Sequence, residues 1–334
     1  MHKFYKLFFT LTLVIGTLIS ISAYSWMMMW IGLEINLLSI IPLFKSTTNK
    51  YPAESTLKYF ITQALASTVV LFSIIFMMNL NNIFNLNYWL ILVMNSAFML
   101  KLGAAPFHFW FPEVAEGLNW TNNLILLTWQ KIAPMILLMY NMNSWFFSGV
   151  SVISSILSGL YSLNQTSLRK IMAYSSINHL SWMIASMMVF KSNWIIYFVI
   201  YSAISFNIVV IFHILKIYYL AQMLNILNTD KLIKVIFILN FLSLGGLPPF
   251  LGFFPKWLVV NSLIIGKFYT LALILIICNL VMLFIYMRII LFSLTISFKE
   301  SIVWTYKINH FKMMIINILT LFGLFISMNI FSTL

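Results

Sequence analysis

Apolar residues run along this chain in stretches of about 20 residues, and short connections between them carry most of the charges. A helix of about 20 apolar residues spans the hydrocarbon core of a bilayer. The pattern therefore predicts one membrane domain, residues 1–334, built as an all-α polytopic bundle of about eleven transmembrane helices. The predicted spans are residues 4–24, 26–44, 57–79, 88–111, 122–140, 145–163, 171–190, 193–215, 235–264, 268–291 and 313–331.

The composition supports a membrane protein over a soluble one. The 334 residues are 62% hydrophobic and 7% charged, whereas an ordinary soluble domain is about 25% charged. Cys278 is the only cysteine, so the chain alone offers neither a disulfide nor a thiolate metal cluster, and we expect no metal site. No glycine-rich phosphate loop or dinucleotide fingerprint is present, so we also expect no bound nucleotide.

The net charge of +13 could indicate nucleic acid binding, but the positions of the basic residues favour another explanation. When the connections alternate between two faces, only Lys191 and Lys267 fall on one of them. This asymmetry follows the positive-inside rule and predicts an N-terminus on the cytoplasmic or matrix side, with the C-terminus opposite. The other face receives Lys3, Lys6, Lys45, Lys50, Lys58, Arg169, Lys170, Lys216, Lys231, Lys234, Arg288, Lys299, Lys307 and Lys312.

Two segments of the chain resemble each other: GAAPFHFWFPE, residues 103–113, and GLPPFLGFFPK, residues 246–256. Without gaps they share a glycine, two prolines and two phenylalanines. The copies lie five predicted crossings apart and should therefore run in opposite directions through the bilayer. Inverted repeats of this kind are typical of transporters. We predict a first repeat at residues 26–163 and a second, inverted repeat at residues 171–331, each a five-helix unit that contains a broken helix.

The prolines and glycines of these segments predict the breaks. Pro106 has no N–H for the carbonyl of Leu102, and its ring crowds that carbonyl. Freed carbonyls are costly in hydrocarbon and must meet water or a polar side chain, although a proline kink can also serve packing alone. The residues expected to break the second helix are Gly245, Gly246, Pro248 and Pro249.

Four charged residues lie too deep in predicted spans to reach water: Glu34, Lys101, Lys131 and Lys256. Lys131 is roughly nine residues from either end of its span, about 14 Å. Burial favours the neutral form of such groups and an opposite charge favours the charged form, so a balanced pair can bind and release protons. Buried charges are also costly, which points to function. A structural ion-pair network is the alternative.

Two histidines offer weaker candidates for a proton path. His179 lies in the middle of its span, and His108 follows Lys101 by seven residues, on a similar face if the helix were continuous. Neither has the spacing of a known metal motif, and a hydrogen-bonded structural histidine is the alternative for both. Three other basic residues lie near span ends from which their side chains can extend to the interface: Lys58, Lys216 and Arg288.

These features resemble the chain 2 family of mitochondrial NADH-ubiquinone oxidoreductase, the respiratory complex I, whose members are antiporter-like membrane subunits. The span count resembles the shortened animal form, which lacks the first three helices of bacterial relatives, and the residue usage resembles insect members. The matching segments are WIGLEINLLSIIP, LKLGAAPFHFWFPEV, TWQKIAP, LRKIMAYSSINHLSWM and LGGLPPFLGFFPKW.

The resemblance implies a proton-translocating subunit in the mitochondrial inner membrane. Glu34 and Lys101 would form a coupled pair, Lys131 would link two half-channels, and Lys256 would face the exit side. Relatives usually carry glycine where this chain has Ser181, two residues after His179, which leaves the role of that histidine in a water path open. NADH, FMN, iron-sulfur clusters and ubiquinone would bind to other subunits, and this chain would hold no cofactor.

The expected partners are other membrane-arm subunits of complex I, in a hetero-oligomer, together with phospholipids; nucleic acid is not expected. Two other functions remain open at this point. A freestanding cation/proton antiporter would exchange ions without an electron donor. A structural scaffold would only pair its buried charges and would transport no protons.

Overall fold

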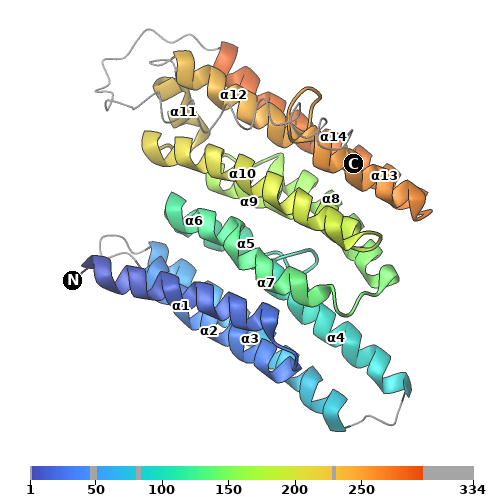
Figure 1. The fold of residues 1–334 in the computed structure, drawn as a ribbon. Coiled ribbons are helices and arrows are strands. Elements are labelled where there is room, and N and C mark those ends of the chain that lie inside the picture. Colours follow the sequence, from blue (N-terminus) through green and yellow to red (C-terminus); the bar gives the residue numbers. More distant parts are fainter. Residues whose placement is uncertain (1, 46–50, 80–83, 228–230, 296–334) are drawn as a thin grey trace, which may run out of the picture. The chain divides into compact units, whose positions relative to one another are not determined.

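The computed structural model describes residues 2–45, 51–79, 84–227 and 231–295, and every named element in them is a helix (Figure 1). The chain divides into two compact units, Met1–Val150 and Ser151–Leu334. The first unit contains α1 (His2–Ser22), α2 (Trp26–Phe44), α3 (Tyr51–Asn79), α4 (Phe84–Leu102), α5 (Trp110–Gly117), α6 (Trp120–Leu127) and α7 (Trp129–Leu138). α8 (Ser144–Ser162) contains the boundary, and the second unit continues with α9 (Leu168–Met187), α10 (Lys191–Leu215), α11 (Leu220–Leu227), α12 (Lys231–Gly245), α13 (Phe253–Ile265) and α14 (Tyr269–Thr295).

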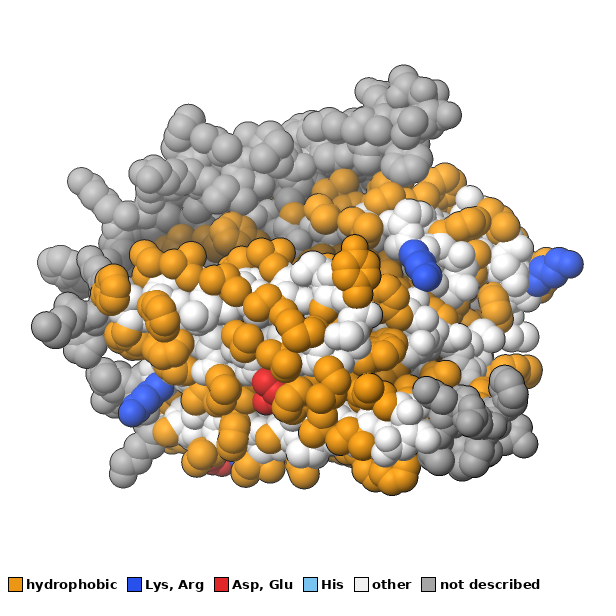
Figure 2. All heavy atoms as spheres, turned by 60° about the horizontal axis from the view of Figure 1, so that its bottom comes forward, with side chains coloured by type: hydrophobic (Ala, Val, Ile, Leu, Met, Phe, Trp, Pro, Cys, Tyr) orange, Lys and Arg blue, Asp and Glu red, His pale blue; other side chains and the backbone are white. Residues whose placement is uncertain are grey.

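Six helices of the described residues are long and apolar enough to cross a membrane: α1, α2, α3, α8, α10 and α14. Their outward side chains are large and apolar, as at Leu11, Leu65 and Ile277, which are all more than half exposed. Figure 2 shows hydrophobic side chains spread across the described part of one face, with few charged side chains among them. Because lipid rather than water can cover such a surface, the predicted all-α membrane bundle is confirmed.

Helix α9 differs from these six because protein surrounds it. It contacts α10, α13 and α14, and nearly all of its residues from Ile171 to Met187 are buried. A helix enclosed by other helices need not be apolar on every face. This position explains why α9 can carry Ser176, Asn178 and His179 in its interior.

The two predicted breaks are confirmed, and they have the same backbone geometry. Gly103 has φ 71° and Gly246 has φ 77°, the left-handed conformation that ends a helix. The Ala104 N–H donates to the Met99 carbonyl (3.0 Å), as the Leu247 N–H donates to the Leu242 carbonyl (3.3 Å). The peptide bonds Ala105–Pro106 and Pro248–Pro249 are both cis.

A third interruption was not predicted. The span at 122–140 is divided at Thr128, where α6 ends and α7 begins. The expectation that Lys131 lies near the middle of one continuous helix is therefore wrong, since it is the third residue of α7. Helix α11, whose start is supported by Gln222 Oε1 accepting from the Tyr218 N–H at 2.9 Å, was also missed. The predicted span at 313–331 lies outside the described residues.

Candidate functional site

The first break brings polar side chains to the end of α4, around Lys101. Lys101 lies one residue before the end of α4 and is 6% exposed. The Nε2 of Gln63, on α3, donates to the Lys101 carbonyl at 3.2 Å. The Nε1 of Trp110 donates to the Leu100 carbonyl at 3.0 Å. Carbonyls near the end of α4 therefore meet side-chain donors, as the sequence requires of a break inside a membrane.

Glu34 and Lys101 are close enough to interact but are not in direct contact. Within the described residues they form no ion pair, although the charge of Glu34 acts on Lys101 through space. Glu34 lies on α2 and is partly buried, and its Oε1 has no hydrogen-bond partner in the described part of the chain. Among the described residues, no direct hydrogen bond therefore fixes the separation of these two charges.

A hydrogen-bonded chain of polar side chains lies beside Lys101. The Tyr59 hydroxyl donates to Gln130 Oε1 at 3.2 Å, and Gln130 Nε2 donates to Asn36 Oδ1 at 2.8 Å. These three residues, with Gln63 and Lys101, line a cavity of about 10 Å³, on the order of the space that one water molecule needs. The cavity joins helices α2, α3, α4 and α7 and gives Lys101 a polar neighbour besides Glu34.

Lys131 is enclosed by the first unit at 1% exposure. Its Nζ lies 5.6 Å from the ring centroid of Phe111, which follows the first break. This distance permits a cation–π interaction when the amine is charged. Gln130, the residue before Lys131 in α7, belongs to the chain of polar side chains beside Lys101. Two adjacent residues of α7 therefore lie in the surroundings of two different buried lysines.

The second break holds Lys256 directly. Its Nζ donates to the Gly245 carbonyl at 2.8 Å, to Asn279 Oδ1 at 2.7 Å and, more weakly, to the Leu244 carbonyl at 3.4 Å. The side chain passes so close to Gly246 that a Cβ there would lie 2.8 Å from Lys256 Cδ. The acceptors released by the broken helix thus surround this amine, which is 6% exposed.

The two breaks satisfy corresponding carbonyls with different donors. Leu244 stands 143 positions after Lys101, and their carbonyls occupy the same place in the repeated segments. In the first unit the donor is the neutral amide of Gln63, and in the second it is the amine of Lys256. The second break can therefore bind and release a proton at a position where the first cannot.

Both histidines are buried, in different surroundings. His179 Nδ1 is 2.9 Å from the Tyr197 hydroxyl, and its ring also contacts Tyr201. His108 lies between α4 and α5, stacked on Phe109 with ring centroids 4.5 Å apart. The helix is not continuous from Lys101 to His108, so their spacing along the sequence does not place them on one helical face.

The structure adds residues that sequence reasoning missed. Gln63 bonds to the Lys101 carbonyl and Asn279 to Lys256 Nζ. Three further polar residues share the cavity of Lys101: Asn36, Tyr59 and Gln130. Their only sequence signal is that each is a polar residue inside an apolar span. Among the described residues, no group of three or more His, Cys, Asp or Glu could hold a metal ion.

Comparisons with known proteins agree with this geometry. A family described as the transmembrane region of NADH:quinone oxidoreductase/Mrp antiporters matches residues 23–282. The chain belongs to this family. Among curated members, NADH-ubiquinone oxidoreductase chain 2 of Anopheles gambiae is 46% identical over 312 residues, which cover 92% of this chain and 91% of that one. The Locusta migratoria protein of the same name is 43% identical over 314 residues, covering 93% and 91%.

The fold of the NADH:quinone oxidoreductase/Mrp antiporter family is seen in solved structures as well. A chain of respiratory complex I from Thermus thermophilus superposes with a TM-score of 0.87 at 21% identity. The match covers 97% of this chain and 79% of that one. At this identity the likeness shows the fold alone.

Proposed function

We propose that this chain is a proton-translocating membrane-arm subunit of respiratory complex I. It transfers protons while NADH oxidation and ubiquinone reduction take place elsewhere in the complex. The observation that supports the proposal most is that three buried lysines accompany two matched helix breaks in a member of this family. Buried amines at broken helices are suited to moving a proton through a bilayer.

In the proposed mechanism, Glu34 and Lys101 form the input of the path. An approaching carboxylate favours the charged form of a lysine, and a receding one favours release of its proton. Redox energy from the rest of the complex changes this separation. Because no direct ion pair locks the two groups in the described structure, small helix movements can alter their interaction.

Lys131 and Lys256 form the later part of the proposed path. Lys131 receives the proton in the first unit, and Lys256 passes it toward the exit side. The Gly245 carbonyl and Asn279 Oδ1 stabilise the ammonium form of Lys256, so that it can hold a proton before release. His179 and His108 are candidates for connecting water molecules to this path.

The same proposal assigns the chain a membrane location, an orientation and protein partners. The chain lies in the mitochondrial inner membrane, with its N-terminus on the matrix side and its C-terminus on the intermembrane-space side. Its protein partners are the other membrane-arm subunits. It binds no cofactor itself, and other subunits carry NADH, FMN, the iron-sulfur clusters and ubiquinone.

The test replaces Glu34 and Lys101 together by leucine and methionine and measures protons moved per NADH oxidised in the assembled complex. The matched control replaces Lys58 and Glu113, an exposed ion pair at 3.0 Å between α3 and α5, in the same way. We expect pumping to fall in the first variant only. Unchanged pumping by a fully assembled Glu34 and Lys101 variant would instead support a structural scaffold.

A freestanding antiporter is the second candidate, and the family description, which includes Mrp antiporters, favours keeping it. It predicts sodium- or potassium-driven proton exchange by the purified chain in vesicles without NADH. Exchange under these conditions would support the antiporter. Its absence, with purification only as part of a larger assembly, would support the complex I subunit.

A further inference from the structure

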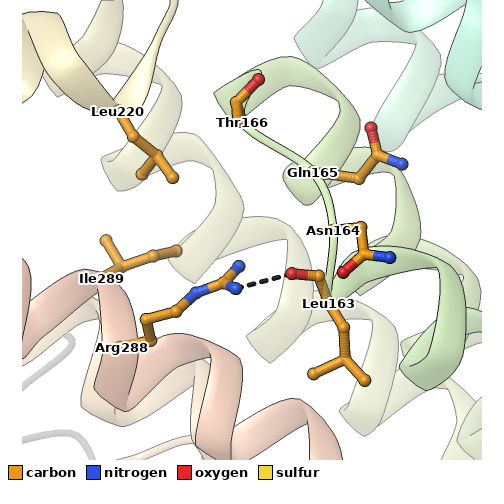
Figure 3. A pocket seen from close by; sticks show the side chains of 7 residues that line it. All are labelled: Leu163, Asn164, Gln165, Thr166, Leu220, Arg288 and Ile289. Carbon is orange, nitrogen blue, oxygen red and sulfur yellow. Dashed lines mark hydrogen bonds between the residues drawn. The ribbon is translucent and has the colours of Figure 1, made fainter.

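A pocket in the second unit is lined by described residues that do not belong to the proposed proton path. Its volume is about 370 Å³, and it is found where the connection between α8 and α9 meets the start of α11 and the second half of α14. Figure 3 shows the Arg288 side chain reaching from α14 toward the α8–α9 connection, with apolar side chains beside it. The lining residues are Leu163, Asn164, Gln165, Thr166, Leu220, Arg288 and Ile289.

The guanidinium of Arg288 is only partly satisfied. Its Nη1 donates to the Leu163 carbonyl at 2.6 Å. Its Nε and Nη2 are buried and have no hydrogen-bond partner in the described part of the chain. Burying N–H groups of a charged side chain without hydrogen-bond partners costs free energy. Arginine stays protonated in proteins, so Arg288 cannot reduce this cost by losing its charge, as a lysine could.

The two unsatisfied nitrogens form one edge of the guanidinium. On that edge the N–H bonds of Nε and Nη2 are parallel, which is the arrangement that binds two oxygens of a carboxylate or a phosphate. The Leu163 carbonyl occupies Nη1 on another edge and fixes the plane of the group. The side chain is thus held in place, and its Nε–Nη2 edge has no hydrogen-bond partner among the described residues.

The surroundings of the pocket favour an anion. None of the described residues that line it is acidic. The Leu220 N–H donates to the Thr166 carbonyl at 3.2 Å, which joins the α8–α9 connection to the start of α11. Arg169 lies over the Tyr218 ring at 4.8 Å, so a second guanidinium belongs to the same end of the unit. Among the described residues, an anion here would meet positive charge and no carboxylate.

The place of the pocket indicates the source of that anion. It lies where α8 ends and α9 begins, and the ends of membrane helices are found at the depth of lipid headgroups. Leu163, Leu220 and Ile289 provide apolar lining beside the guanidinium, which suits a molecule that is charged at one end and apolar at the other. Basic sites between membrane helices commonly take anionic headgroups.

We propose that this pocket binds the phosphate of an anionic phospholipid, with two phosphate oxygens on Nε and Nη2 of Arg288. The site is independent of the proposed proton path, because Glu34, Lys101, Lys131 and Lys256 do not line it. Loss of lipid binding would therefore test this site, whereas loss of proton pumping would test the proposed function.

The experiment removes lipid from the purified complex with detergent and measures reuptake of phosphatidylglycerol from vesicles by mass spectrometry. It compares the natural chain with R288Q and R288K. Lys267→Gln is the control, since it removes one positive charge from an exposed residue that does not line the pocket. We expect R288Q to bind one phosphatidylglycerol roughly tenfold or more weakly, R288K to lie between, and Lys267→Gln to match the natural chain.

Three results would overturn the proposal. The first is equal uptake by the natural chain and both Arg288 variants. The second is loss of the bound lipid on adding millimolar inorganic phosphate, which would make free phosphate the ligand. The third is a structure of the complex in which a carboxylate of another subunit lies on Nε and Nη2. R288K keeps the charge and so remains informative if R288Q does not assemble.

Discussion

Replacing Gly246 by alanine should disturb proton transfer through Lys256, because the two residues are in contact at the second helix break. Gly246 has φ 77°, a conformation that costs other residues about 1–2 kcal/mol. The new Cβ would lie 2.8 Å from Lys256 Cδ and 3.0 Å from its Nζ, well inside the ordinary carbon contact distance of about 3.5–4.0 Å. The lysine side chain must therefore move.

The movement of Lys256 puts its two short hydrogen bonds at risk. These bonds reach the Gly245 carbonyl at 2.8 Å and Asn279 Oδ1 at 2.7 Å. A hydrogen bond to a charged group contributes roughly 1.5–3 kcal/mol. Loss of one bond together with the backbone cost gives a penalty of roughly 2.5–5 kcal/mol for the charged, correctly placed amine.

The neighbouring Gly245 provides the matched control. A Cβ at Gly245 would meet Tyr286 Cδ2 at 3.5 Å, an ordinary contact, and its φ is not positive. The assay is protons moved per NADH oxidised, measured on equal amounts of assembled complex in proteoliposomes. We expect Gly246→Ala to lower this ratio and Gly245→Ala to leave it unchanged. Equal ratios for the two variants would refute the reasoning.

Two further substitutions test the polar contacts of the lysines. Asn279→Leu removes the 2.7 Å acceptor of Lys256 and should lower protons per NADH in the assembled complex. Asn279→Ser, which supplies a hydroxyl oxygen as acceptor in place of the amide oxygen, should lower the ratio less. No change in either variant would contradict the role given to Asn279. Gln63→Leu leaves the Lys101 carbonyl without its donor and should destabilise the chain by about 1–3 kcal/mol, seen as a lower unfolding temperature. Asn143→Leu, which removes an exposed hydrogen bond to Tyr88, is its control and should change that temperature little.

The sequence was sufficient to locate both matched breaks, because a missing proline N–H acts locally. Pro106 and Pro249 each follow a glycine by three positions, and those glycines adopt the left-handed conformation in the structure. The chemistry that ends the helix is contained in a few adjacent residues. Sequence reasoning therefore succeeded where the cause of the structure is local.

The break at Thr128 shows where local reasoning was insufficient. The Thr128 hydroxyl donates to the Leu124 carbonyl at 2.7 Å, a bond that can bend a helix. Pro134, which removes another helical donor, lies six residues later inside α7. The sequence does not show whether a threonine hydroxyl donates to the carbonyl four residues earlier. The division of this span could therefore not be predicted from the sequence.

The side-chain hydrogen-bond partners at the breaks, the donor Gln63 and the acceptor Asn279, could not be predicted because they come from distant parts of the chain. Gln63 is 38 residues from Lys101, and Asn279 is 23 residues from Lys256. The sequence required that freed carbonyls find partners but did not identify them. Helix packing decides that choice, since several polar residues in apolar spans were equally eligible.

The most direct test of the proposed path is the number of protons moved per NADH oxidised by a fully assembled complex that carries Lys131→Ala. Lys191→Ala, at the exposed start of α10, is the control. If Lys131 transfers protons, the ratio falls in the first variant and is unchanged in the second. A Lys131→Ala complex that pumps with the natural ratio would contradict the account.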